Sequence, residues 1–190
     1  MRKIENWEEE YKKADEVVSF ENLPVAPQIC KVVKIEDIAD KEYLKVYFDI
    51  ADGEYKGFFK EKADNLGEWP SQGITYRSYK KSAEKFFMAF IKAIEKSNPN
   101  FKWNWDETKL IDKLFVANFG EEEFVWDGER RVNVKCQEIR SLQALRDNKI
   151  KPLKIKKLTK EQENELYAVT DTAEELPANN MAEIESDLPF

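Results

Sequence analysis

The chain has 190 residues and no histidine, which suits one domain of ordinary size with a tail and excludes catalysis by a histidine base. Its formal charge of −7 argues against a uniformly basic nucleic-acid-binding surface, so the distribution of charge along the chain matters. The two cysteines, Cys30 and Cys136, have no neighbouring ligand set and predict neither a disulfide framework nor a zinc site.

Residues 1–24 are predicted to form an N-terminal arm or a short helix. Charged residues follow Met1 at once, so we expect no secretory or membrane-spanning segment, no membrane partner and a cytoplasmic protein. Pro24 and Pro27 end any helix, and alternation over Gln28–Ile38 predicts a first strand. Tyr43–Ile50 is a second strand, with the four apolar residues Leu44, Val46, Phe48 and Ile50 on its core face.

Asp52-Gly53 is a hairpin signal, so Tyr55–Lys60 is predicted to return as a third strand. Gly57 inside this segment indicates a bend or bulge that can shift the register by one residue. Either Phe58 or Phe59 then faces outward, and the sequence leaves this choice open.

Residues 64–78 are predicted to be a long loop carrying Trp69, and Tyr79–Lys96 a helix. The apolar stripe of this helix is predicted to be core: Phe86, Phe87, Phe90, Ile91 and Ile94. A short helical turn at Asp106–Ile111 precedes a fourth strand at Leu114–Phe119. A hairpin tip at Glu121–Glu129, with Asp127-Gly128, leads into a fifth strand at Arg131–Ile139. Trp103 and Trp105 are interpreted as packing residues where the helix returns to the sheet.

The charge reverses sharply near the end of the chain. Residues 146–160 hold seven Lys or Arg and are predicted to be a basic linker, whereas residues 161–190 hold nine acidic residues and no Lys or Arg. Residues 1–160 therefore carry 31 basic against 29 acidic residues, a balance of +2. Residues 161–190 have too few apolar side chains to fold and are expected to be a disordered acidic tail.

The tail ends in Asp187-Leu188-Pro189-Phe190. This ending resembles the acidic tip of the single-stranded DNA-binding proteins (SSB) of bacteria and their phages, with Leu188 where isoleucine is more usual. Segments such as KEYLKVYFDIADGEYKGFF, FFMAFIKAIEKSNPNFKW and GEEEF also look like replication-module proteins of phages of Gram-positive bacteria, and this likeness covers about residues 5–145. The resemblance implies a phage protein, in the host cytoplasm, that coats unwound DNA during replication, recombination and repair.

The predicted order of strands and helix, β-β-β-α-β-β, is that of the five-stranded OB-fold barrel, a mainly β fold. We expect this domain to span residues 25–145; other all-β barrels and a small α+β sheet remain alternatives. OB barrels bind single strands on the face of strands two and three and on the adjoining loops. Lysines neutralise phosphates there, and aromatic rings stack on bases without sequence preference.

On this reading the candidate DNA-binding residues follow the second and third strands, the loop before the helix, and the last hairpin. They are Tyr43, Lys45, Tyr47, Lys56, Phe58, Lys60, Trp69, Arg77, Lys80, Trp126, Arg131 and Lys135. The tip is expected to recruit replication or recombination proteins through Glu185, Asp187, Leu188, Pro189 and Phe190. An ordinary solvated sheet face would also favour Tyr and Lys.

The sequence contains no phosphate-cradling GxGxxG or GxxxxGK[ST] motif and no GxSxG motif. We therefore expect a protein that is not an enzyme, with no catalytic residues, no metal and no cofactor, and with homo-oligomerisation left open. The alternative is a replisome adaptor or inhibitor that does not bind DNA and whose tip mimics the SSB tip to occupy the pockets of partner proteins.

Overall fold

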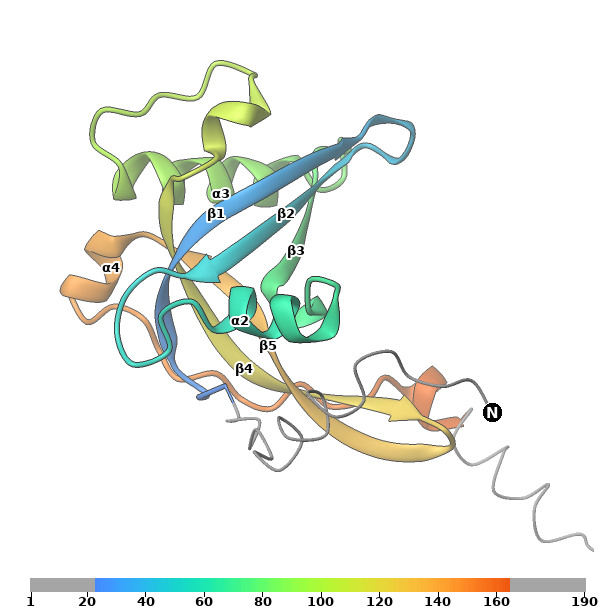
Figure 1. Cartoon of the computed structure of the whole chain (residues 1–190). Coiled ribbons are helices and arrows are strands. Elements are labelled where there is room, and N and C mark those ends of the chain that lie inside the picture. The colour runs from blue at the N-terminus through green and yellow to red at the C-terminus, as the bar shows by residue number, and fades with distance from the viewer. Residues whose placement is uncertain (1–22, 165–190) are drawn as a thin grey trace, which may run out of the picture.

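The computed structural model describes residues 23–164 and contains one five-stranded antiparallel sheet with strand order β3-β2-β1-β4-β5 (Figure 1). The strands are β1 Pro27–Ile38, β2 Tyr43–Ile50, β3 Ile74–Ser78, β4 Leu114–Trp126 and β5 Glu129–Arg140. The helices are α2 Phe58–Leu66, α3 Glu84–Ser97 and α4 Leu142–Arg146, with 3-10 turns η1 Ala39–Lys41, η2 Ser71–Gly73 and η3 Glu107–Leu110. The described chain is therefore mainly β, as predicted.

The predicted second strand is confirmed with the predicted bounds. Its four apolar residues are at most 4% exposed, because they face the core on one side of the pleated sheet. The first, fourth and fifth strands are also present. The last two are longer than predicted and form a hairpin that projects from the body and turns at Asp127-Gly128 (Figure 1).

The predicted third strand is wrong. Tyr55–Gly57 lie in a turn, and Phe58 begins α2. Gly57 has a left-handed φ of 83°, and the buried carboxylate of Asp49 on β2 accepts a hydrogen bond of 2.9 Å from the backbone N–H of Phe59. Satisfying a free N–H of the first turn stabilises a helix at this point rather than a returning strand.

The true third strand, β3, lies in the segment predicted to be a loop. It pairs with β2 through Tyr43–Ser78, Lys45–Tyr76 and Tyr47–Ile74. The observed order of strands and α-helices is therefore β-β-α-β-α-β-β-α, with α2 between the second and third strands.

The core is a cluster of phenylalanine rings between the sheet and the helices. Phe48 is fully buried, and its ring centroid lies 5.6 Å from that of Phe59 on α2 and 5.5 Å from that of Phe115 on β4. Edge-to-face pairs of this kind stabilise a core beyond the burial of their area. In α3, Phe87, Phe90, Ile91 and Ile94 are buried as predicted, but Phe86 is 74% exposed and does not belong to the core stripe.

The sheet is not closed by backbone pairing between β3 and β5 in the described residues. A side-chain bond crosses this gap: Gln72 Nε2 donates to Asn133 Oδ1 over 2.7 Å. Part of the predicted basic linker covers the edge of β4 that faces away from β5. Lys156 in this segment exchanges backbone hydrogen bonds of 2.8 Å with Glu121 and Glu123 of β4. Leu158 in the same segment is buried, so these residues pack on the domain.

Candidate nucleic-acid interface

The solvent side of β1, β2 and β3 carries three tyrosines, two lysines and one glutamate, which we call the outer face: Lys34, Glu36, Tyr43, Lys45, Tyr47 and Tyr76. The rings of Tyr43 and Tyr76 stand edge to face with centroids 5.5 Å apart. Tyr76 is 58% exposed and Tyr43 is half-buried. This pair offers aromatic surface on which an unstacked base can lie.

A β-bulge places Lys34 and Glu36 on the outer face. Before it, Val32 pairs with the inward-facing Phe48; after it, Lys34 pairs with Tyr47, because the register shifts by one residue at Val33. The shift moves every following side chain of β1 to the opposite side of the sheet. Sequence alternation alone groups Lys34 with the buried residues of β1.

Two lysines lie over the ring of Tyr47. The Nζ atoms of Lys34 and Lys45 are 5.1 and 4.9 Å from its centroid, and its hydroxyl donates to Glu36 over 2.9 Å. The hydrogen bond and charge of Glu36 raise the pKa of Lys34, and a hydrogen bond with Tyr47 raises that of Lys45. Both lysines therefore keep their positive charge well above neutral pH. Tyr47 itself is 9% exposed, so it supports the lysines and does not offer the free ring that the sequence predicted.

Trp69 extends the outer face towards η2. Its ring meets Tyr47 edge to face at 6.5 Å, and its Nε1 donates to the carbonyl of Gly73 over 3.0 Å. A side chain on Gly73 would fall 2.6 Å from this nitrogen, so glycine is required for the close approach. Trp69 is half-buried in the loop before η2, where it packs partly against the core, and its predicted role in DNA binding stays a prediction.

Several other predicted site residues lie elsewhere because the third strand was misplaced. Lys56 is exposed in the turn before α2, and Phe58 packs against the core beneath Lys62. Lys60 is exposed on α2 and paired with Asp64 at 3.0 Å. These three residues do not share a face with Tyr43 and Lys45, so their assignment to one strand face is wrong.

Arg77 points to the inner side of the sheet. Its guanidinium lies 5.6 Å from the ring of Phe90, and burial lowers its pKa. Its buried Nε has no hydrogen-bond partner in the described residues. Lys80 is exposed two residues after β3.

The last hairpin holds the remaining predicted contacts. Trp126 is 63% exposed at its tip, and Arg131 pairs with Glu129 at 3.1 Å. Lys135 lies 3.8 Å from Glu122, whose carboxylate also binds Lys156 at 2.6 Å. These cations are partly neutralised by neighbouring acids. The predicted docking residues of the tip (Glu185, Asp187, Leu188, Pro189 and Phe190) lie outside the described residues.

Sequence reasoning missed Tyr76 and Lys34. Tyr76 could have been found, since Ile74-Thr75-Tyr76 is a short run of strand-forming residues inside the predicted loop. Lys34 carries no such signal, because a bulge depends on contacts between strands. Over residues 23–164, no three Asp, Glu or Cys side chains converge on a point that could hold a metal ion.

No family model and no curated protein sequence matches this chain significantly. None of the helices within residues 23–164 is both long and apolar enough to cross a membrane.

Proposed function

We propose that this protein binds single-stranded DNA without sequence preference, as the SSB-like ending suggests, and that it is not an enzyme. The observation that carries the proposal is the outer face, where the exposed Tyr76 and the half-buried Tyr43 form a pair on the same face as two charged lysines, Lys34 and Lys45. Rings stack on bases of any sequence, and lysines neutralise the phosphates between them.

We further propose that the domain is an OB-type barrel, partly open between β3 and β5. Three features support this: five antiparallel strands, α3 between the third and fourth strands, and the bond between Gln72 and Asn133 across the gap. The outer face then coincides with the strand-two and strand-three face on which OB folds bind nucleic acid. The additional helix α2 connects the second and third strands along the chain, and its residue Phe59 packs in the core.

The acidic residues 161–190 are proposed to recruit replication or recombination proteins through the tip, in phage DNA replication and recombination. On this division of labour the folded domain holds the DNA and the tail holds proteins. Removing residues 161–190 is expected to preserve DNA affinity or to raise it, because nine negative charges are removed. Loss of DNA binding on truncation would contradict the division.

The experiment that tests the proposal is a titration of the full chain with oligo(dT), followed by quenching of tryptophan fluorescence. We expect saturable quenching, with an affinity that falls steeply as salt increases through counterion release. A duplex of the same length is the control and should bind more weakly. Absence of saturable binding to oligo(dT) at low salt would refute the proposal.

The adaptor hypothesis remains the second candidate because of one observation on charge. Residues 1–160 carry a balance of only +2, and Glu36 lies between the two lysines of the outer face, with an oxygen 2.6 Å from the Nζ of Lys34. An adaptor that mimics the SSB tip would leave oligo(dT) unbound while a peptide of residues 181–190 still bound a replication protein. This candidate would be favoured if that peptide competed with the full chain for the replication protein and the full chain did not bind DNA.

A further inference from the structure

A pocket of about 340 Å³ lies on the core side of the sheet, where residues of β3, α3 and β5 come together. Arg77 of β3 faces this side because it pairs with Leu44, whose side chain is buried in the core. The volume lies within the range of pockets that hold small organic groups. The lining residues used below are Arg77, Phe86, Phe90, Glu138 and Arg140.

The guanidinium of Arg77 has no acidic partner. Its Nε is buried without a hydrogen-bond partner, and over residues 23–164 the group makes no ion pair. It lies 5.6 Å from the centroid of the Phe90 ring. A contact between a cation and a ring recovers only part of the free energy that a partly desolvated charge loses. An anion in the pocket would therefore be stabilised by this guanidinium.

The neighbouring groups of β5 do not supply the missing negative charge. The carboxylate of Glu138 is already held by Arg140, whose Nε and Nη2 donate to it over 3.1 and 2.9 Å. Cys136 is the ionisable neighbour of Arg77, but burial raises the pKa of its thiol to about 12, so it is uncharged at neutral pH. Two arginines and one glutamate line the pocket, which leaves one positive charge uncompensated.

The surroundings of Arg77 favour a carboxylate over a DNA phosphate. A guanidinium binds the two oxygens of either anion side by side. The wall beside it is apolar, with the Phe86 ring 74% exposed and Phe90 buried, and would cover hydrocarbon rather than sugar. Arg77 also follows Tyr76 directly on β3, so the two side chains point to opposite sides of the sheet. The pocket is therefore on the side away from the outer face.

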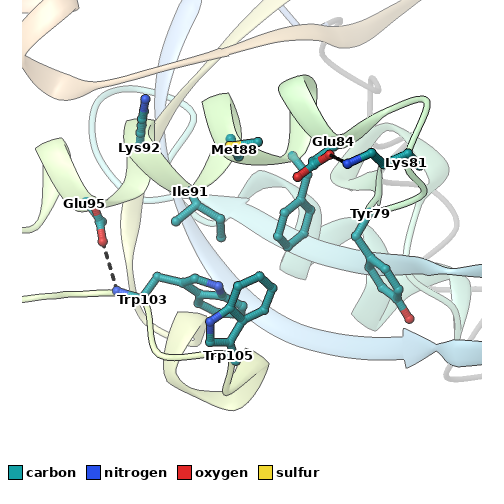
Figure 2. Close-up of a pocket in the computed structure, with 10 residues that line it drawn as sticks. Tyr79, Lys81, Glu84, Met88, Ile91, Lys92, Glu95, Trp103 and Trp105 are labelled. Carbon is teal, nitrogen blue, oxygen red and sulfur yellow. Dashed lines mark hydrogen bonds and ion pairs between the residues drawn. The ribbon is translucent and has the colours of Figure 1, made fainter.

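A larger groove, of about 580 Å³, lies on the other side of α3 and shows no comparable need for an anion (Figure 2). Its Lys81 already faces Glu84 at 3.1 Å, and its Lys92 is exposed to solvent. The buried atom without a partner there, Nε1 of Trp103, belongs to a neutral ring. Nothing in the described part of this groove selects one class of ligand, whereas the pocket at Arg77 selects an anion.

We propose that the pocket at Arg77 binds a single carboxylate carried on an apolar group, with the guanidinium holding the two oxygens and the ring of Phe86 covering the hydrocarbon. A free organic acid or an acidic side chain of a peptide supplies this chemistry, and titration with both separates the two sources. The inference goes beyond the proposed function and does not depend on it, because neither residue lies on the outer face.

Titration of the full chain with phenylacetate tests the pocket, with neutral phenylacetamide as the matched control ligand. The readouts are the NMR signals of the Arg77 Nε–H and of the backbone amides of residues 137–140, at constant ionic strength. We expect saturable shifts with phenylacetate and none with phenylacetamide, because the guanidinium binds the charged form.

Three variants locate the binding. Arg77→Lys keeps the charge but loses the planar fork, so it should weaken phenylacetate binding about 10- to 150-fold, the equivalent of one lost charge-assisted hydrogen bond. Phe86→Ala should weaken it about 2- to 10-fold, the equivalent of one lost ring contact, and leave oligo(dT) binding unchanged, because α3 packs on the core side of the sheet. Arg146→Leu is the control, since this exposed arginine does not line the pocket.

The wild-type titration does not depend on the folding of any variant. Absence of a saturable shift, equal shifts with phenylacetamide, or undiminished binding by Arg77→Lys would overturn the inference. If a peptide of residues 181–190 shifts the same signals at lower concentration than phenylacetate, the pocket takes peptides, and the reverse order assigns it to free organic acids. Displacement of phenylacetate by oligo(dT) would identify a DNA phosphate as the occupant and overturn the carboxylate assignment.

Discussion

Replacing Tyr76 by alanine tests the outer face with little risk to the fold. The ring is 58% exposed, and its described ring contact is the edge-to-face pair with Tyr43. A cross-strand contact at the surface contributes less than about 1 kcal/mol to stability. A ring that stacks on a base contributes about 1–3 kcal/mol to binding, so the affinity for oligo(dT) should fall about 5- to 150-fold while unfolding changes little.

The salt dependence of the same variant gives a second, independent readout. Tyr76→Ala removes no charge, so the slope of log affinity against log salt should not change. Lys45→Gln removes one phosphate contact and should reduce this slope by about 0.7. Fluorescence anisotropy of labelled oligo(dT) at several salt concentrations measures both quantities, with Phe86→Ala as the control. Equal affinities for wild type and Tyr76→Ala, or a changed slope for Tyr76→Ala, would refute the stacking role.

Three further predictions concern the structure around the site. Asp49→Ala removes the buried acceptor at the start of α2 and should lower the free energy of unfolding by about 1.5–3 kcal/mol in a denaturant titration; the exposed Asp52→Ala is the control, and equal losses would contradict the capping role. Hydrogen bonding to Asp37 raises the pKa of Tyr79 to about 12. The contribution of this hydrogen bond to the stability of the fold is therefore fully present below about pH 10 and is lost as the pH rises to about 12. Asp37→Asn should shift the tyrosinate absorbance midpoint downward, and an unchanged midpoint would exclude this cause. Gly73→Ala should cost about 1–3 kcal/mol, because its Cβ would lie 2.8 Å from a core ring; wild-type stability of this variant would show that the loop can move.

The strands with clear alternation were predictable, and the segment after β2 was not. In Tyr43–Ile50 every second residue is apolar, so a half-buried strand is the arrangement that buries them together. The next segment contains Asp52-Gly53, which favours a hairpin locally and therefore predicts a returning strand. What decides the outcome is Asp49, whose carboxylate reaches ten residues ahead to the N–H of Phe59. Local propensity carries no information about such a contact.

The same distinction applies to the site. Tyr43 and Lys45 could be placed on the outer face because they lie on a strand with regular alternation. Phe58 could not, since its place depended on the misassigned third strand, and Tyr76 took the position beside Tyr43 instead. Rings and lysines do share one face of the sheet, but the residues that join Tyr43 and Lys45 there are Lys34 from β1 and Tyr76 from β3, and not the predicted Lys56, Phe58 and Lys60.

The bulge in β1 shows why charge placement was beyond reach of the sequence. Periodicity assigns Lys34 to the side of Cys30 and Val32, where an ion would be buried at a cost of several kcal/mol. One unpaired residue at Val33 reverses the side for the rest of the strand, so that Lys34 and Glu36 lie on the solvent side of the sheet, in contact with Tyr47. The pairing of the strands as a whole, and not any short motif, therefore decides that the lysines adjoin the rings. The proposed interface depends on that register as much as on the residues that compose it.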